Sequence, residues 1–320
     1  MASARDEILD WAEQGRIPPD RLRAALEEGG AIPTADQWRG FLDRLFLFMG
    51  AVLLGAGVIF FFAFNWQAMG RFAKFALVEA PVLVSLLLVW GIGLDRIGGK
   101  AALLAGALVV GAVFALIGQT YQTGADTWEL FAVWAAAILP WALVARFPAL
   151  WIFWLLLANV AVSLYFITLG FWGMLFAPEK LAWLLFGLNT AALAIWEGLA
   201  LAGVEWLRER WAVRLLAVAS AVAVTTLALF DIVRPDSQWG LPAWLAWMVA
   251  VYVVYRRLAK DLFVLAGGVL SAVVVIATLL GKSMRLNDAG AFLFIGLVVI
   301  AISAAGGWWL KQVAQEEGES

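Results

Sequence analysis

Residues 101–147 read AALLAGALVVGAVFALIGQTYQTGADTWELFAVWAAAILPWALVARF. Two almost wholly apolar segments in this stretch, 101–118 and 128–147, enclose a polar turn at 118–129. A helix needs about 17–25 predominantly apolar residues to cross the hydrocarbon core of a bilayer, and both segments fall in that range. The stretch therefore predicts two membrane-spanning helices joined by a polar turn.

The composition extends this prediction to most of the chain. Of its 320 residues, 64% are hydrophobic and 14% are charged, whereas soluble domains have roughly 45–50% apolar and about 25% charged residues. The mean hydropathy is +0.90. We expect an all-α, polytopic transmembrane bundle at 45–310, with a small cytoplasmic helical segment at 1–44 and a polar tail at 311–320. About ten spans are expected, at 45–64, 72–94, 101–118, 128–147, 149–171, 181–203, 212–230, 239–255, 262–280 and 289–310.

The polar N-terminal segment has the pattern of a helical hairpin. Capping residues and glycines predict one helix at 3–14 and a second at 20–28, and Thr34 then opens a third helix that enters the membrane. Each short helix has one apolar side. Two interpretations remain open for this hairpin: a solvated cap packed on itself, or a docking element for a partner helix.

The basic residues predict the orientation, because Lys and Arg are enriched in cytoplasmic loops. With ten spans and a cytoplasmic N-terminus, 16 of the 22 Lys and Arg fall on the inner side. The six on the outer side are Arg71, Lys74, Lys180, Arg234, Lys282 and Arg285. We therefore expect a multi-pass protein of the bacterial inner membrane with both termini in the cytoplasm, and the polar turn at 118–129 faces outward.

The residue inventory limits the chemistry. The chain has no Cys and no His, so the common zinc, haem and iron–sulfur ligand sets and the Ser-His-Asp and Cys-His catalytic arrangements are excluded. No phosphate-binding loop or dinucleotide fingerprint is present. The net charge of −2 gives no indication of nucleic-acid binding. We expect no metal, no cofactor and no enzymatic activity.

Charged and amide side chains inside predicted spans are the first functional candidates, because such groups are costly in lipid. Glu79 and Glu197 are the intramembrane charges, and Asn159 and Asn189 lie within the fifth and sixth spans. One hypothesis is a shared outward-facing polar cavity. Its members are Asn65, Gln67, Lys74, Glu79, 119–126, Glu129 and Asn189. The alternative is a set of separate hydrogen bonds between helices.

The polar turn also has two interpretations. Asp126 as N-cap and Glu129 as the third helical residue match a capping box at the start of the fourth span. The same two carboxylates could instead bind a cation or act as acid and base. Gly118 and Gly124 permit an ordered turn. The candidate ligand-binding residues are Gln119, Tyr121, Gln122 and Asp126 in the turn, together with Glu79 and Asn189.

Two further patterns are typical of membrane helices. Small residues four apart let helix backbones approach closely, and Trp near span ends forms an interfacial belt. The small pairs are Ala51 with Gly55, Ala107 with Gly111, and Ala301 with Ala305; the interfacial Trp residues are Trp66, Trp172, Trp239, Trp308 and Trp309. We expect ordinary packing within the chain from the small pairs, and lipid anchoring from the Trp.

Two motifs carry a family resemblance. Residues 50–66 read GAVLLGAGVIFFFAFNW and residues 118–131 read GQTYQTGADTWELF. In both, the chain resembles a bacterial family of predicted membrane proteins catalogued as domain of unknown function 2157. The resemblance covers about 5–147 and implies an inner-membrane protein with a cytoplasmic N-terminal helical segment. It brings no substrate and no catalytic residue, and it implies that the positions at 119–126 belong to the family pattern.

Two functions follow from these observations as competing hypotheses. The first is a non-enzymatic component of the cell envelope, embedded in the lipid bilayer, that binds or scaffolds a protein partner through residues 1–30 and the outer turn. The second is a transporter or channel for a small solute that uses the outward-facing cavity. A transporter needs polar groups that continue from that cavity to Glu197.

Overall fold

The computed structural model describes residues 4–65, 70–121, 124–168, 178–234, 237–284 and 289–318, and this part of the chain contains helices and no strand. The first half consists of α1 (Ala4–Glu13), α2 (Leu22–Glu28), α3 (Ala35–Asn65), α4 (Arg71–Ile92), α5 (Ile97–Tyr121), α6 (Thr127–Ala145) and α7 (Pro148–Thr168). The second half consists of α9 (Pro178–Leu201), the 3-10 turn η2 (Glu205–Leu207), α10 (Arg210–Val233), α11 (Gly240–Val253), the π-helical turn η3 (Val254–Leu258), α12 (Leu262–Ser283) and α13 (Ala289–Gly318).

The predicted all-α polytopic membrane fold is confirmed. Within the described residues, nine helices are long and apolar enough to cross a membrane. The expected span at 239–255 is not among the nine, because α11 alone has only 14 residues. The π-helical turn η3 continues α11 without a break, so helical backbone runs from 240 to 258.

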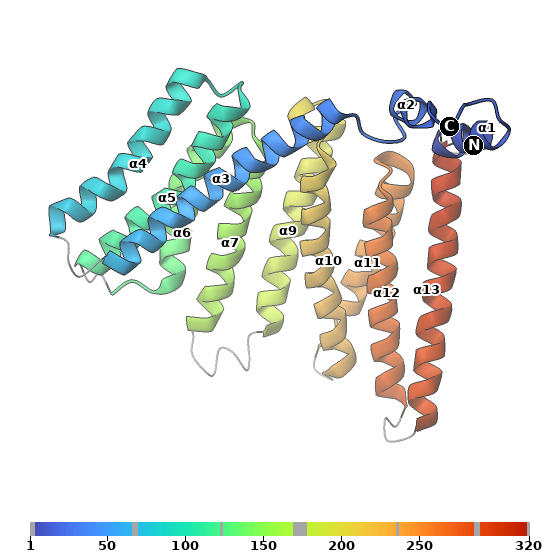
Figure 1. The fold of residues 1–320 in the computed structure, drawn as a ribbon. Coiled ribbons are helices and arrows are strands. Elements are labelled where there is room, and N and C mark those ends of the chain that lie inside the picture. Colours follow the sequence, from blue (N-terminus) through green and yellow to red (C-terminus); the bar gives the residue numbers. More distant parts are fainter. Residues whose placement is uncertain are drawn as a thin grey trace.

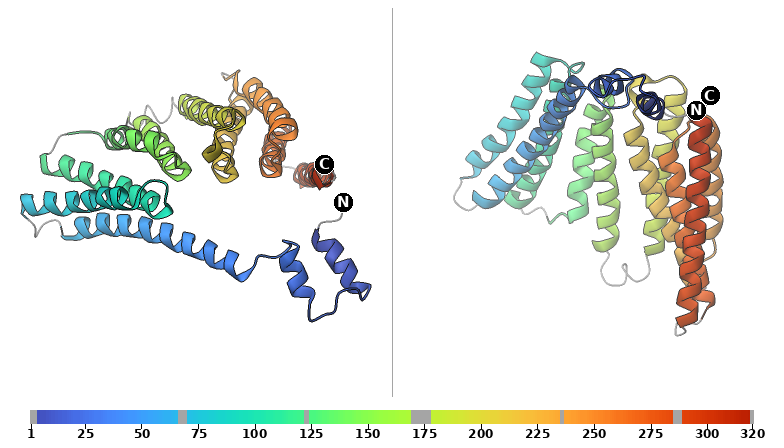
Figure 2. Two further views of the ribbon diagram at one scale, coloured as in Figure 1. Left: turned by 90° about the horizontal axis from the view of Figure 1, so that it is seen from above. Right: turned by 45° about the vertical axis from the view of Figure 1, so that its right-hand side comes forward.

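The helices alternate in direction and form a curved row that is open on one side (Figures 1 and 2). Both chain ends lie at the same end of the bundle (Figure 1). The connections α4–α5, α6–α7, α9–α10 and α11–α12 lie at this end as well (Figure 1). We call it the terminal end, and the opposite one the distal end.

The N-terminal hairpin forms largely as its sequence predicts. Thr34 and Gln37 form a reciprocal capping box at the start of α3, with N–H to side-chain oxygen distances of 3.0 and 3.3 Å. Ile8 of α1 is buried, and a Cβ on Gly29 would lie 2.5 Å from its Cδ1, so α1 packs against the end of α2. The predicted start of α2 at Asp20 is two residues early, because Arg21 is the N-cap and no side chain caps the helix.

Helix α7 joins the two halves of the bundle. One buried cluster is formed by residues of α5, α6 and α7, and a larger one by residues of α7 and α9 to α13. Trp151 and Trp154 of α7 pack against both clusters. The indole N–H of Trp154 donates to the carbonyl oxygen of Ala135 at 2.9 Å, which ties α7 to α6.

The small-residue pairs have different environments. Gly55 allows α3 to approach α5, since a Cβ there would lie 3.0 Å from Cβ of Leu108. Gly111 of α5 makes room for the indole of Trp134, whose ring atoms would lie 2.5 Å from an added Cβ. The third predicted pair, Ala301 and Ala305, is exposed on α13. The small residue of α3 thus allows a close helix approach, and that of α5 accommodates a large aromatic ring.

The interpretation of Trp as lipid anchors applies to only some of these residues. Trp239 is strongly exposed at the start of α11, as a belt requires, whereas the exposed Trp308 lies inside α13. Trp66 and Trp172 lie outside the described residues. Trp134 is buried and donates its indole N–H to the carbonyl oxygen of Ala107 at 2.7 Å. Trp therefore also supplies hydrogen-bond donors that bind one helix to the next.

Candidate functional site

An ionic cluster lies at the terminal end, around Arg210 at the start of α10. Its Nη1 donates to both carboxylate oxygens of Glu197 on α9, at 3.0 and 3.2 Å. Its Nε donates to Oδ2 of Asp261 at 3.0 Å, and its Nη2 to the carbonyl oxygen of Ala259 at 3.2 Å. The side chains of Glu197 and Asp261 are 7% and 1% exposed. One guanidinium thus connects α9, α10 and the segment that leads into α12.

Asp261 has two further roles in this cluster. Arg214, one turn after Arg210, donates from Nε to Oδ2 of Asp261 at 3.1 Å. The same carboxylate accepts from the backbone N–H groups of Phe263 and Val264 and caps α12. With two arginines and two carboxylates, the cluster is balanced in charge. Such an arrangement suits a structural contact that holds helices together better than a binding site for a charged ligand.

The π-helical turn η3 closes one side of this cluster. The ring of Tyr255 lies 5.7 Å from the guanidinium carbon of Arg210. Its hydroxyl is buried and has no hydrogen-bond partner among the described residues. π-helical turns are often found at functional sites. Here, the turn directs the aromatic face of Tyr255 toward the cation that holds the helices together.

Amide groups connect α7 and α9 within the membrane. Asn189 donates from Nδ2 to Oδ1 of Asn159 at 2.7 Å, and Asn159 donates in return at 3.2 Å. Each amide also donates to the carbonyl oxygen four residues earlier on its own helix. Asn189 is 3% exposed. The two predicted intramembrane amides thus pair with each other.

The Asn159–Asn189 pair should show measurable coupling in stability. We expect the single variants Asn159→Ala and Asn189→Ala to be non-additive, with a coupling energy of about 0.6–1.7 kcal/mol, as found for hydrogen bonds between membrane helices. A double-mutant cycle of unfolding free energies in detergent micelles measures it. Thr278 bonds only within its own helix, so Asn159→Ala with Thr278→Ala should be additive to within about 0.5 kcal/mol. Equal coupling in both cycles would contradict the pairing.

Two matching hydrogen-bond networks connect the helices of the second half. Trp247 of α11 donates to Ser220 of α10 at 2.9 Å, and Ser220 bonds Thr190 of α9 at 2.6 Å. Trp244 of α11 donates to Ser271 of α12 at 2.8 Å, and Ser271 bonds Thr225 of α10 at 2.6 Å. Ser220 and Ser271 are buried. Each serine therefore connects two neighbouring helices to α11.

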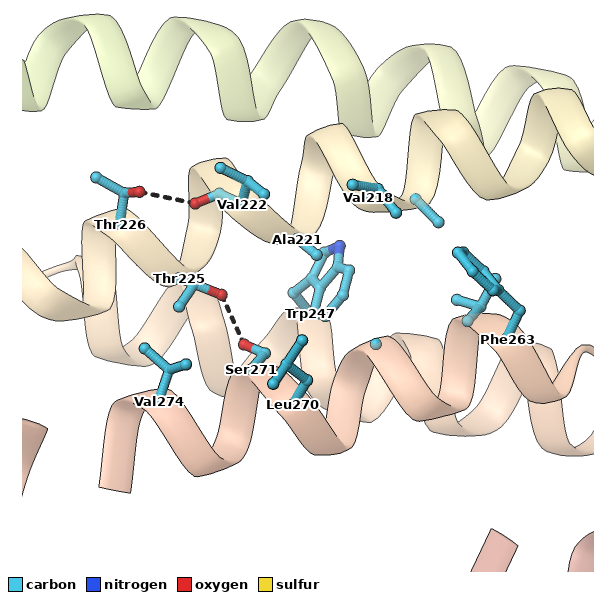
Figure 3. Close-up of a pocket in the computed structure, with 13 residues that line it drawn as sticks. Val218, Ala221, Val222, Thr225, Thr226, Trp247, Phe263, Leu270, Ser271 and Val274 are labelled. Atoms are coloured by element: carbon cyan, nitrogen blue, oxygen red, sulfur yellow. Dashed lines mark hydrogen bonds between the residues drawn. The ribbon is translucent and has the colours of Figure 1, made fainter. Parts of the chain in front are cut away.

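A groove of about 270 Å³ lies beside these networks, between α10 and α12. Figure 3 shows Thr225 bonded to Ser271 and Thr226 bonded to the carbonyl oxygen of Val222, with apolar side chains around them. The hydroxyl groups of the groove are thus engaged within the chain. An apolar wall without free donors or acceptors suits a lipid chain better than a polar solute.

The polar turn at 118–129 lies at the distal end, and most of its described residues are exposed. Gln119 and Tyr121 belong to the last turn of α5, which continues past Gly118, and Gln122 lies outside the described residues. Gly124 has a φ of 66°, a conformation that favours glycine. The ring of Tyr121 is 60% exposed and lies 6.2 Å from that of Phe75 on α4.

Asp126 and Glu129 take the positions of a capping box, but only part of its bonding is found. Asp126 is the N-cap of α6, and its backbone carbonyl accepts from the N–H of Glu129 at 3.0 Å. Its side chain makes no capping hydrogen bond. The carboxylate of Asp126 is therefore exposed at the distal end without its expected cap partner.

Glu79 lies on an exposed face of α4, about two turns and roughly 12 Å into the helix. A groove of about 270 Å³ runs between α4 and α5 at this point. Its lining consists of Glu79, Val82, Leu83, Val110, Val113 and Phe114. Glu79 is the single ionisable residue of the lining, and no hydrogen bond or ion pair to it is found among the described residues.

The structure separates the predicted cavity residues. Glu79 lines the groove between α4 and α5, and Asn189 lines another with Asn159 and residues of α10. Helices α5 to α7 lie between α4 and α9 (Figure 1). Glu197 belongs to the ionic cluster at the terminal end. Gln67 lies outside the described residues.

Sequence reasoning missed several polar residues that the fold brings together. Asp261 had a local signal, because it directly precedes an apolar run and so marks a helix start. Arg210 and Arg214 are four apart and share one helix face, but nothing local indicates that they meet Asp261. At the distal end, Ser237 donates to Glu179 at 2.9 Å and also contacts Asp231. These contacts join residues distant in sequence and need the tertiary fold.

The comparisons with known proteins support the family resemblance. Residues 9–151 match the family described as predicted membrane protein (DUF2157). The match covers α2 to α6, the second half of α1 and the first turn of α7, and it includes both motifs on which the resemblance rests. The chain matches no curated protein and no solved structure. The protein is thus a multi-pass membrane protein whose first half is similar to a family of unknown function.

Proposed function

We propose that this protein is a non-enzymatic binding component of the bacterial inner membrane, which docks a membrane helix of a partner protein against the groove at Glu79. The observation that supports it is an intramembrane carboxylate on an exposed helix face. Ionisable residues within spans are costly in lipid and almost always face another protein segment or a polar cavity. The Glu79 face of α4 is therefore a surface that needs a covering partner.

The groove indicates the chemistry of that partner. Its walls are apolar apart from Glu79, so they suit the apolar face of another helix. The carboxylate requires a hydrogen-bond donor or a cation at the same depth, because an unpaired charge is unfavourable in a low-dielectric environment. A transmembrane helix with a single Lys, Arg, Ser, Thr or Asn on its apolar face meets both conditions.

The hairpin of α1 and α2 fits this proposal as a second contact. In this proposal it lies in the cytoplasm, in agreement with the excess of basic residues at the terminal end. Trp11 of α1 is 44% exposed although its neighbour Ile8 is buried. Tryptophan is enriched among the residues that contribute most to protein interfaces. Residues 1–30 would thus hold a soluble part of the partner.

The transporter alternative has less support. It needs polar groups that continue from the distal end to Glu197. The amides of Asn159 and Asn189 bond each other, and the buried hydroxyls of Ser220 and Ser271 are likewise engaged. Groups that already hold helices together are poorly suited to bind and release a solute.

A photo-crosslinking experiment tests the docking proposal. A photoreactive phenylalanine analogue replaces Leu83, which lines the groove, in cells of the native host. The matched control replaces Leu88, which is 46% exposed and, nine residues after Glu79, points to the opposite side of α4. We expect a protein adduct from position 83 and none from 88. Adding Glu79→Leu should remove the adduct, because the partner loses its polar contact.

Two results would contradict this function. The first is a set of adducts of equal yield from positions 83 and 88, which would mean non-specific contact along α4. The second is an adduct formed only between two copies of this chain, which would replace a distinct partner by self-association. Mass spectrometry of the excised adduct band distinguishes these results from the expected one.

A further inference from the structure

A basic cavity of about 470 Å³ lies at the terminal end, between the two halves of the bundle. Three separate elements each contribute one cation: Arg44 from α3, Lys100 from α5, and Arg146 from the junction between α6 and α7. Trp206 of η2 and Trp211 of α10 form part of the opposite wall. The volume lies within the roughly 300–1,000 Å³ that is usual for ligand sites.

Two of the cations are held in position by the fold. Nζ of Lys100 lies 5.8 Å from the ring centre of Phe147, a cation–π contact. Phe147 is buried and stacks on Phe48 of α3 at 5.8 Å, so the aromatic base of the cavity is fixed. Arg146 has a φ of 45° and ends α6 in the left-handed conformation.

The conformation of Arg146 is unusual for this residue type. It is the one positive-φ residue other than glycine in the described part of the chain. Glycine is the usual residue at such helix ends, because a side chain is strained there. Strain of this kind is concentrated at functional sites, where the surrounding structure holds it in place. The guanidinium of Arg146 is thereby placed at the cavity instead of continuing along α6.

The charge balance of the cavity favours an anion. Two carboxylates also line it, those of Asp95 and Glu209. Glu209 accepts the indole N–H of Trp211 at 2.7 Å. Within the described chain, no carboxylate lies within ion-pair distance of Arg44, Lys100 or Arg146. The three cations are therefore available to a ligand, and they outnumber the carboxylates.

We propose that this cavity binds the phosphate headgroup of an anionic phospholipid, which Arg44, Lys100 and Arg146 contact together. Arg presents a planar fork that suits phosphate oxygens, and basic pockets between membrane helices on the cytoplasmic side bind such headgroups. The cavity lies where helices end and aromatic residues gather, which is the level of lipid headgroups. The bound lipid joins α3, only 6% buried over its span, to α5, α7 and α10.

Lipid titration of the purified, delipidated full-length protein tests this proposal. Native mass spectrometry follows binding of cardiolipin, phosphatidylglycerol and phosphatidylcholine to the wild type, Lys100→Gln and Arg146→Gln. The control is Arg257→Gln, an exposed cation at the same end outside the cavity. We expect the two anionic lipids to bind saturably, and each cavity variant to weaken that binding by about tenfold. The control should bind like the wild type.

Three outcomes would overturn the proposal. The first is equal binding by the wild type, the cavity variants and Arg257→Gln. The second is phosphatidylcholine binding as tightly as cardiolipin, because that result removes the requirement for an anion. The third is competition by millimolar inorganic phosphate with no preference for lipid, which would assign the cavity to a soluble phosphate compound. Size-exclusion profiles and helical circular dichroism establish that each variant is folded before titration.

Discussion

Replacing Arg210 with leucine is expected to lower the free energy of unfolding by about 3–5 kcal/mol, the usual effect of removing one partner from a buried ion pair. Arg210 is the partner through which Glu197 reaches the rest of the cluster, and the Glu197 side chain is only 7% exposed. The variant leaves this carboxylate buried without a counter-charge. Unfolding in mixed micelles of mild detergent and dodecyl sulfate measures the change.

Arg214→Leu is the matched control for this prediction. Arg214 lies one turn further along α10, its side chain is 46% exposed, and among the described residues its one ion pair is with Asp261. Asp261 keeps Arg210 and two backbone N–H groups when Arg214 is removed. We expect a loss of about 1 kcal/mol or less, as for exposed pairs. Equal losses for the two variants would contradict the central position of Arg210.

A double variant distinguishes two effects of the substitution: the loss of the Arg210–Glu197 ion pair, and the cost of leaving the Glu197 carboxylate buried without a counter-charge. Replacing both Arg210 and Glu197 with leucine removes the orphaned carboxylate together with its partner. Buried ion pairs replaced by apolar residues are often neutral in stability. The double variant should therefore be more stable than Arg210→Leu alone. A further loss of stability would show that Glu197 makes its contribution independently of Arg210.

Gly99→Ala is the second substitution with a large expected effect. A Cβ on Gly99 would lie 2.1 Å from the carbonyl oxygen of Gly93 and 2.9 Å from its carbonyl carbon. Backbone atoms cannot move aside as a flexible side chain can, so the tight turn between α4 and α5 must open. Overpacking in a well-packed region costs about 1–3 kcal/mol, and we expect a loss at the upper end of this range. Thermal unfolding in detergent reports it.

The neighbouring glycine is the control for this substitution. A Cβ on Gly98 would lie 3.6 Å from Cγ2 of Ile92, an ordinary contact. Both glycines lie in the first turn of α5. Alanine in a helix is favoured over glycine by up to about 1 kcal/mol, so Gly98→Ala should be neutral or stabilising. Stabilisation at both positions would mean that helix propensity, and not the close approach to Gly93, decides the result.

The two proposed binding sites lie on the region that matches the family. Glu79 and the cations Arg44, Lys100 and Arg146 all fall within 9–151. The lipid site and the partner groove lie at different depths, since Glu79 is about two turns inside α4 while the cavity is at the terminal end. The two proposals are therefore tested by different variants, and failure of one leaves the other in place.

Most helices could be placed from the sequence, because the bilayer requires long apolar segments and the breaks between them are polar or glycine-rich. The hairpin could also be predicted from the sequence, because capping residues are local signals, as Thr34 shows for α3. The span at 239–255 was the weakest prediction. Its helix is short, and it is followed by a π-helical turn that places the ring of Tyr255 beside Arg210 of another helix.

The candidate sites were only partly predictable. Glu79 and Glu197 were identified, because an acidic residue in an apolar span is conspicuous in the sequence alone. Their surroundings were not identified: Glu197 meets Arg210 and Asp261, and Glu79 lines an apolar groove. The basic cavity was also missed, because its three cations lie in α3, in the first turn of α5 and at the end of α6, and each is an ordinary charge when it is considered alone.

By itself, the sequence determined that this chain is a helical, multi-pass membrane protein, because hydrophobicity and segment length act locally and the bilayer selects for them. It also determined where the turn at 118–129 interrupts the apolar segments. Only the tertiary structure decided which polar groups bond to one another and hold helices together, and which remain available to bind a ligand or a partner. Asn159 and Asn189 bond each other, whereas Glu79 and the three cations of the cavity make no ion pair within the described residues. This outcome depends on how each helix is rotated about its axis and on which helices pack against it, and a hydrophobic pattern specifies neither.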